Sequence, residues 1–186
     1  MAQDVMYTTR WVDTTRKPAP RHSWLSADEA RERWDGGYDR YGIVSVVDAA
    51  TRDADGTPRP RWAVFGSATS AIRVRFFTPG GSNWRTTDYD VIDGRLWRWI
   101  CWTYVYPDQD TRYRLTQATR VIKEEFLPDR TGSVQFDERD GLLHKATFTD
   151  APVDGFWLER PAFGDWTDLA NPDYGVPTGT DWPTPA

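Results

Sequence analysis

Cysteine and histidine are scarce in this chain of 186 residues, which has one cysteine, Cys101, and two histidines, His22 and His144. One cysteine excludes an internal disulfide, and these three side chains cannot complete a zinc site without carboxylates. Cys101 stands in an apolar segment, distant in sequence from both histidines, which favours a small buried side chain over a nucleophile. We therefore predict no metal and no cofactor.

Long apolar runs and catalytic motifs are also missing. No stretch of eighteen apolar residues occurs, and the first ten residues have no apolar core like that of a signal peptide. We therefore expect a cytoplasmic protein with no membrane partner. The segment Pro79-Gly80-Gly81-Ser82 lacks the lysine and the strand-to-helix context of a phosphate-binding loop, so it predicts a hairpin turn. A G-x-S-x-G motif is absent, which disfavours a serine hydrolase.

Tryptophan, by contrast, is abundant: the chain has 11, and three lie in the segment L-W-R-W-I-C-W-T-Y-V-Y at residues 96–106. Alternate side chains of a strand point to opposite faces, and here both faces are mostly apolar. Asp93-Gly94 before the segment is a hairpin signal, and Pro107 after it is a stop. We predict a central strand covered by protein on both sides. One face would hold Trp97, Trp99, Cys101, Thr103 and Val105, and the other Leu96, Ile100, Trp102, Tyr104 and Tyr106.

Turn signals separate further short segments of β-branched and aromatic residues, which predict strands. Residues 112–126 also fit a helical stripe, but their Thr, Val, Ile and Tyr content favours a strand. Ser26 and Glu29 have the spacing of a capping box, and with Gly36 as a stop they predict one short N-terminal helix over residues 27–35. The predicted strands are residues 5–13, 42–49, 61–66, 71–78, 84–92, 96–106, 112–126, 133–138 and 142–149.

These elements predict a mainly β (α+β) fold: an antiparallel meander of about seven or eight strands, in a strongly curved sheet or a calycin-like barrel. Residues 1–170 would form a single β-rich domain, and residues 171–186 a Pro-rich acidic C-terminal tail. Residues 150–186 carry seven acidic side chains and one arginine, a formal charge of −6, against −5 for the whole chain. We expect this segment to pack on the body through Phe156, Trp157, Phe163 and Trp166.

Arginines alternate with aromatic residues in the strands, as at Arg95 to Trp99. Such a pattern can hold single-stranded nucleic acid, but it also forms cation-π pairs within a protein. The net negative charge opposes a polyanion, so we predict structural pairs and no nucleic-acid partner.

Acidic side chains around aromatic anchors are typical of a surface that recognises a basic protein. The first hypothesis is therefore a non-enzymatic cytoplasmic binding protein that recognises another macromolecule, with the profile of an immunity or antitoxin-type inhibitor. Its contact residues would be Trp157, Asp165, Trp166 and Asp168.

The alternative is a barrel that encloses a small apolar or aromatic ligand, as a carrier or as a cyclase or isomerase that shapes its substrate. If the protein is an enzyme, His144 and Asp90 would be its catalytic residues, because His144 is in phase with Leu142 and Ala146 and should face the interior. A hydrogen-bonded core histidine is the simpler interpretation. The ligand-binding residues would be Trp97, Trp99, Trp102 and Tyr104.

Overall fold

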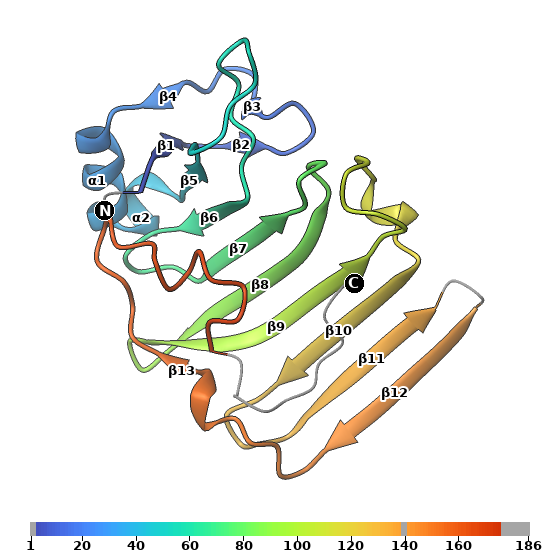
Figure 1. Ribbon diagram of the computed structural model, residues 1–186. Helices are drawn as coiled ribbons and strands as arrows, with labels where there is room; N and C mark the ends of the chain where they lie inside the picture. Colours follow the sequence, from blue (N-terminus) through green and yellow to red (C-terminus); the bar gives the residue numbers. More distant parts are fainter. Residues whose placement is uncertain (1–2, 139–140, 176–186) are drawn as a thin grey trace.

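One large antiparallel β-sheet forms the body of the protein (Figure 1). The computed structural model describes residues 3–138 and 141–175. The strands of this sheet are β1 (Val5–Thr8), β4 (Trp24–Leu25), β5 (Val44–Asp48), β6 (Trp62–Gly66), β7 (Ile72–Phe77), β8 (Asn83–Ile92), β9 (Arg95–Val105), β10 (Arg120–Phe126), β11 (Gly132–Glu138), β12 (Leu142–Phe148) and β13 (Trp157–Leu158). The other elements are β2 (Trp11–Val12) and β3 (Lys17–Pro18), the helices α1 (Ala27–Gly36) and α2 (Tyr38–Tyr41), and the 3₁₀ turns η1 (Leu115–Gln117) and η2 (Asp154–Phe156).

The predicted mainly β antiparallel meander is confirmed. Strands β5 to β12 follow one another in the chain and in the sheet, and β1 and β4 continue the sheet beyond β5. With eleven described strands the sheet is larger than predicted, and it is open, with β12 and β4 at its two edges. A barrel closes only when its edge strands pair along their length. Among the described strands no pairing joins β12 to β4, so the sheet does not close into the predicted calycin-like barrel, and it is not strongly curled either.

The predicted N-terminal helix is confirmed as α1, and its capping box is formed. The Ser26 Oγ accepts a hydrogen bond from the Glu29 backbone N–H at 3.2 Å, and the Glu29 carboxylate accepts one from the Ser26 backbone N–H at 2.8 Å. The helix ends at Gly37, whose φ of +75° is a conformation that glycine adopts readily. The one-turn helix α2 follows directly, so this region holds two short helices instead of the one predicted.

Two predicted strands are shorter than expected. The first, over residues 5–13, is divided into β1 and β2. In residues 112–126 the strand β10 begins only at Arg120, and the 3₁₀ turn η1 precedes it. Residues 112–126, whose sequence fits both a helix and a strand, thus contain a short 3₁₀ turn followed by a strand.

Strand β9 lies inside the sheet, as the aromatic segment predicted. It pairs with β8 along one side and with β10 and β13 along the other. Asp88 of β8 pairs with Ile100, but the next residue, Tyr89, pairs with Arg98, so Trp99 is an extra residue in β9. A bulge of this kind shifts the alternation of side chains. The predicted assignment of faces is therefore wrong across Trp99, because Arg98 lies on the side of Cys101 instead of that of Ile100.

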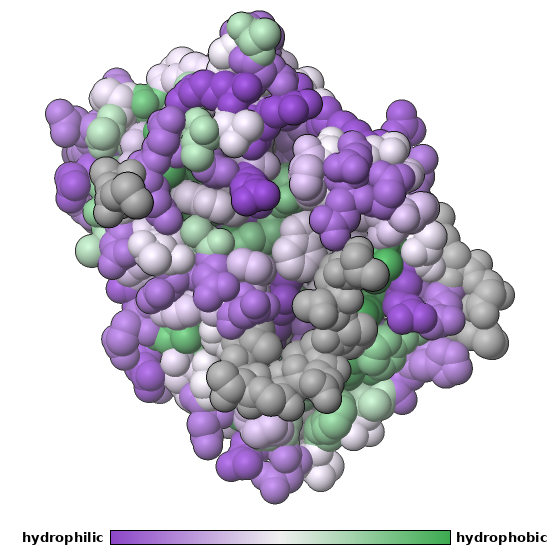
Figure 2. All heavy atoms as spheres, viewed as in Figure 1, coloured by the Kyte–Doolittle hydropathy of each residue, from purple (hydrophilic) through white to green (hydrophobic). Residues whose placement is uncertain are grey.

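Different segments cover the two faces of the sheet. On one face, α1 and the C-terminal segment pack against β5 to β7, with Trp34 and Trp166 both 1% exposed. On the opposite face, the ribbon of β2 and β3 places Trp11 against Val47, Ala63 and Phe77. A third cluster joins β9, β10 and β11 to η2 through Trp97, Ile122 and Phe156. Figure 2 shows hydrophilic residues over the ribbon at the top and apolar residues on the lower right of the same view.

The two α-helices, α1 and α2, have 10 and 4 residues. Within the described part of the chain, no helix is long and apolar enough to cross a membrane.

Candidate functional site

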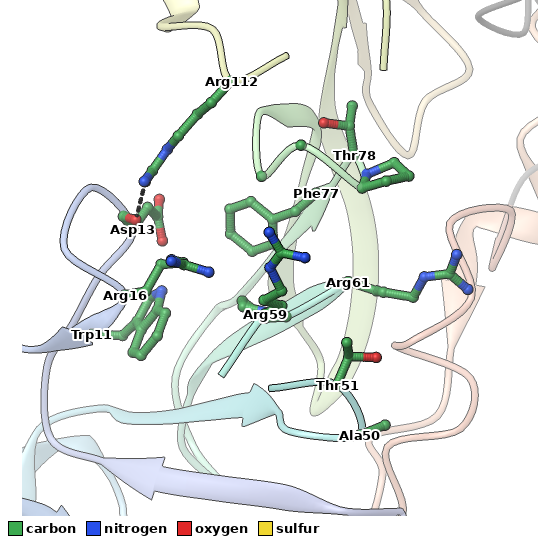
Figure 3. Close-up of a pocket in the computed structure, with 14 residues that line it drawn as sticks. Trp11, Asp13, Arg16, Ala50, Thr51, Arg59, Arg61, Phe77, Thr78 and Arg112 are labelled. Atoms are coloured by element: carbon green, nitrogen blue, oxygen red, sulfur yellow. Dashed lines mark hydrogen bonds between the residues drawn. The ribbon is translucent and has the colours of Figure 1, made fainter. Parts of the chain in front are cut away.

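A cavity of about 560 Å³ lies between the β2–β3 ribbon and one end of the sheet (Figure 3). Its walls come from five separate stretches of the chain. The ribbon contributes Trp11, Asp13 and Arg16. The rest come from residues 50–51 after β5, residues 59–61 before β6, residues 77–81 at the end of β7, and Arg112 in the loop after β9.

The lining of this pocket is strongly cationic. It contains the four arginines Arg16, Arg59, Arg61 and Arg112 against one acid, Asp13, a formal charge of +3. The whole chain carries −5. A cleft lined by charge of one sign concentrates the field and attracts ions of the opposite sign. The lining therefore has a local charge opposite in sign to the net charge of the chain.

Asp53, beside the pocket, fixes two of the four guanidinium groups. Its Oδ2 lies 2.5 Å from Arg16 Nη2, and its Oδ1 lies 2.7 Å from Arg59 Nε. One carboxylate thus orients Arg16 and Arg59, which come from the ribbon and from the loop before β6. Each guanidinium has five N–H donors, so most donors of both remain for other acceptors.

Arg112 and Arg75 attach the turn of the ribbon to the rest of the molecule. Arg112 Nη2 donates to the backbone oxygens of Asp13 at 2.6 Å, drawn in Figure 3, and of Thr14 at 3.1 Å. Arg75 Nη1 donates to Asp13 Oδ2 at 2.6 Å. These contacts hold Asp13 in place, so the pocket is formed before any ligand arrives.

Two buried polar atoms in the pocket lining have no hydrogen-bond partner within the described structure: the Trp11 Nε1 donor and the Asp13 Oδ1 acceptor. Trp11 is only 5% exposed, and Figure 3 shows its indole nitrogen on the side of Arg16. A buried polar group without a partner costs about 1–3 kcal/mol, so such groups are few in folded proteins. Four other buried side-chain atoms of the described residues also lack a partner, among them Trp166 Nε1 and Glu124 Oε1, so the two in the pocket are distinguished by their place in the lining of a cavity.

The aromatic residues predicted to bind a ligand do not line this pocket. Trp97 is 1% exposed and donates from Nε1 to the Phe126 backbone oxygen at 2.9 Å. Trp102 lies under the Lys123 ammonium, 5.4 Å from it, and Tyr104 is half-buried on the same strand. Trp99, in the bulge, is 38% exposed. These four side chains are distributed along β9 and do not gather around one cavity.

His144 and Asp90 are not brought together. His144 is exposed on the edge strand β12, so the prediction that it faces the interior is wrong, because none of the described segments covers it there. Asp90 is exposed on β8 and accepts a hydrogen bond from the Val91 backbone N–H at 2.8 Å. Strands β9, β10 and β11 lie between them, a separation of roughly 19 Å at the usual strand spacing. The strand register also places the two side chains on opposite faces of the sheet. His144 is aligned across the strands with Arg85 of β8 and shares its face. Asp90, five residues after Arg85 on β8, points to the other face.

The C-terminal segment packs on the body, as predicted. Trp166 stacks edge-on against Trp34 at 4.9 Å, and Trp157 lies 4.8 Å from Trp97. Of the residues predicted to contact a partner protein, Trp166 is therefore buried, Trp157 is half-buried, and Asp165 and Asp168 are exposed. This placement gives the aromatic residues an intramolecular role.

Several acids of the C-terminal segment form ion pairs with arginines of the sheet. Glu159 lies 3.2 Å from Arg95, and Asp173 lies 3.7 Å from Arg85. These pairs partly neutralise the arginines of the sheet.

A buried charged cluster surrounds Cys101 in the middle of the sheet. Arg98 Nη2 donates to Glu124 Oε2 at 3.2 Å, and Arg85 Nε donates to the Cys101 sulfur at 3.1 Å. Burial by itself lowers the pKa of Arg98, but the charges of Cys101 and Glu124 together raise it above its ordinary value. Burial also raises the pKa of Tyr89, which lies on the same face. These groups are buried between the strands β8, β9 and β10.

Within residues 3–138 and 141–175, no group of three or more His, Cys, Asp or Glu side chains is placed to hold a metal ion. Comparisons with protein-family models, with curated protein sequences and with solved structures found no match to this chain. Its function must therefore be inferred from the chemistry of its own residues.

The arginines of the pocket were not identified as a site from the sequence. Arg16, Arg59 and Arg112 belong to loops that are far apart in the chain, and isolated arginines in loops are usually solvated. The density of arginine in residues 52–61 was the one available signal. It could not indicate a pocket, because the opposite wall comes from residues 11–16.

Proposed function

We propose that this protein binds a small anionic ligand, without covalent chemistry, in the pocket between the β2–β3 ribbon and the sheet. The observation that carries this proposal is a cavity of about 560 Å³ whose lining holds four arginines and an unpartnered buried indole N–H. Hydrogen bonds between a guanidinium and an anion each contribute about 1.5–3 kcal/mol. Two or three such hydrogen bonds would bind an anion more strongly than a neutral pocket of this size does.

The sequence suggested, as an alternative, a small apolar ligand inside a barrel. The present proposal keeps a small ligand, but the binding site is elsewhere and the ligand is an anion. The ligand lies beside an open sheet instead of inside a barrel, and the lining selects for negative charge instead of apolar surface. The recognition of a basic macromolecule, through Asp165 and Asp168, stays a prediction.

Thermal unfolding and calorimetric titration with inorganic phosphate, pyrophosphate, citrate and adenosine monophosphate test this proposal. A ligand at about a hundred times its Kd stabilises a protein by about 2.7 kcal/mol, which corresponds to roughly 5–10 °C in Tm for a chain of this size. We expect at least one of these anions to raise Tm by several degrees, and the effect to shrink as salt screens the arginines.

The matched variants are Arg16→Gln with Arg59→Gln, and Arg95→Gln as the control. Arg95 is an exposed arginine paired with Glu159, far from the pocket. The double variant should lose about a hundredfold or more in affinity, because two charge-assisted hydrogen bonds are removed. The control should bind as the native protein does. Absence of binding for every anion, or equal binding by the double variant, contradicts the proposal.

A further inference from the structure

We infer that the ligand of this pocket is an organic phosphate monoester whose organic part carries a hydrogen-bond donor, a hydroxyl or an N–H. The inference rests on the proposed function and specifies its ligand. It follows from three features of the pocket: the pair of guanidiniums held by Asp53, the unpartnered Trp11 N–H, and the unpartnered oxygen of Asp13.

The guanidinium pair favours a phosphate over a single carboxylate. Arg16 and Arg59 approach from two different loops and are held by the two oxygens of the same Asp53 carboxylate. Two planar donor groups that converge from two directions match a tetrahedral dianion, which offers acceptors on several sides. The lining charge of +3 is also better balanced by two negative charges than by one.

Trp11 adds a neutral donor beside this pair. Its indole Nε1 can only donate, and it lies on the Arg16 side of the pocket without an acceptor among the described residues. A phosphate oxygen bound to Arg16 supplies that acceptor. The indole and the two guanidiniums together therefore bind one phosphate group.

Asp13 requires the opposite chemistry. Its Oδ2 is occupied by Arg75 at 2.6 Å, whereas its Oδ1 is buried without a partner in the described part of the chain. An ionised carboxylate oxygen only accepts, so the ligand must present a hydroxyl or N–H to it. Methyl phosphate as the dianion has no O–H or N–H and would instead meet Oδ1 with like charge. The cavity of about 560 Å³ is also in the range that holds an organic molecule, well above the size of one phosphate group.

Sugar phosphates and nucleoside monophosphates share this chemistry, and titration calorimetry can distinguish them. The probes are inorganic phosphate and methyl phosphate, which carry no organic donor, and ribose 5-phosphate and adenosine monophosphate, which do. We expect at least one of the last two to bind about tenfold or more tightly than methyl phosphate, as one hydrogen bond to a charged group predicts. The one that binds more tightly identifies the class of the organic part.

Two variants separate the roles of the two unpartnered atoms. Trp11→Phe keeps an aromatic ring and removes the N–H, so it should weaken every phosphate probe by about tenfold. In Asp13→Asn, the amide oxygen must face Arg75, which leaves the NH₂ group where Oδ1 stood. This variant should abolish the preference for donor-bearing phosphates while methyl phosphate binds at least as well as before.

The outcomes distinguish this inference from the proposed function. Binding of no anion at all contradicts both. Equal affinity for methyl phosphate and for the donor-bearing phosphates, or binding of citrate alone, overturns the inference and leaves an anion-binding pocket. If Asp13→Asn still prefers the donor-bearing phosphates over methyl phosphate, the inference is also overturned, because Asp13 would then not contact the organic part of the ligand.

Discussion

Glu124 places its carboxylate between two buried arginines. Its Oε2 lies 3.2 Å from Arg98 Nη2 and 4.0 Å from Arg85 Nη2, and the three residues are 4%, 2% and 9% exposed. A charge removed from water is costly unless an opposite charge and hydrogen bonds compensate it. Glu124 therefore offsets part of the free-energy cost of burying both arginines. We expect its removal to reduce the stability of the fold more than the removal of an exposed ion pair.

Replacement of Glu124 by Gln should destabilise the protein by about 3–5 kcal/mol, because the buried Arg98 guanidinium loses its ion-pair partner and Arg85 keeps only Asp173. The matched control is Glu125→Gln, which removes the adjacent acid and its 2.6 Å contact with Lys123 at the surface. That change should cost about 0–1 kcal/mol. Urea unfolding of both variants gives the two free energies. Similar small losses in both would mean that water reaches the Glu124 cluster.

At the scale of elements, local signals specify individual helices and hairpins. The Ser26 and Glu29 pair is one example, since each group satisfies a backbone N–H of the other at the start of α1. Hydrogen bonds from the Ser26 backbone and side chain lower the pKa of Glu29 below its ordinary value of 4.5. The stabilisation that Glu29 provides is therefore present above that value and is lost as the pH falls through the lowered pKa.

Ser26→Ala should destabilise the protein by about 1 kcal/mol at pH 7, because the first turn of α1 loses its side-chain cap. Ser26→Asp, which retains an acceptor oxygen, should stay close to the native stability. The loss caused by Ser26→Ala should shrink as the pH falls through the lowered pKa of Glu29, because protonation removes the carboxylate that accepts from Ser26. Thermal unfolding over a series of pH values measures this, and an equal loss for Ala and Asp would show that the cap contributes little.

At the scale of the whole molecule, other segments cover both faces of the sheet at β5 to β7, whereas the last strand, β12, is more exposed. The C-terminal segment and α1 cover one face of β5 to β7, and the ribbon covers the other. Strand β12 forms an edge, and Leu143 and Phe148 on it are 64% and 38% exposed. Local stability should therefore fall from the covered strands toward β12.

Hydrogen exchange followed by mass spectrometry should show this gradient. Peptides from β7, β8 and β9 should exchange slowest, because these strands are paired on both sides and pack one face into the core. Peptides from β12 should exchange fastest among the strands, since one edge has no partner within the described residues. Protection of β12 as strong as that of β9 would contradict this and would indicate that another chain covers the edge.

The sequence by itself determined most of the local structure. Asp93-Gly94 forms the predicted tight turn, with φ of +52° and +79°, and the aromatic segment after it is an interior strand. The capping box, the meander and the packing of the C-terminal segment through Trp166 also follow the prediction. These features depend on contacts between near neighbours or on the burial of large apolar side chains, and both are visible in the order of residues.

Only the tertiary structure decided the bulge at Trp99, the exposure of β12 and the arginine-lined pocket. The bulge depends on the register of β8 against β9, which alternation along one strand does not contain. The exposure of His144 follows from the position of β12 at an edge. The pocket joins Asp13 to Arg75 and Arg112, which are 62 and 99 residues away in the chain. Such groups meet only after the sheet has formed, so their shared electrostatics cannot be found in any local pattern.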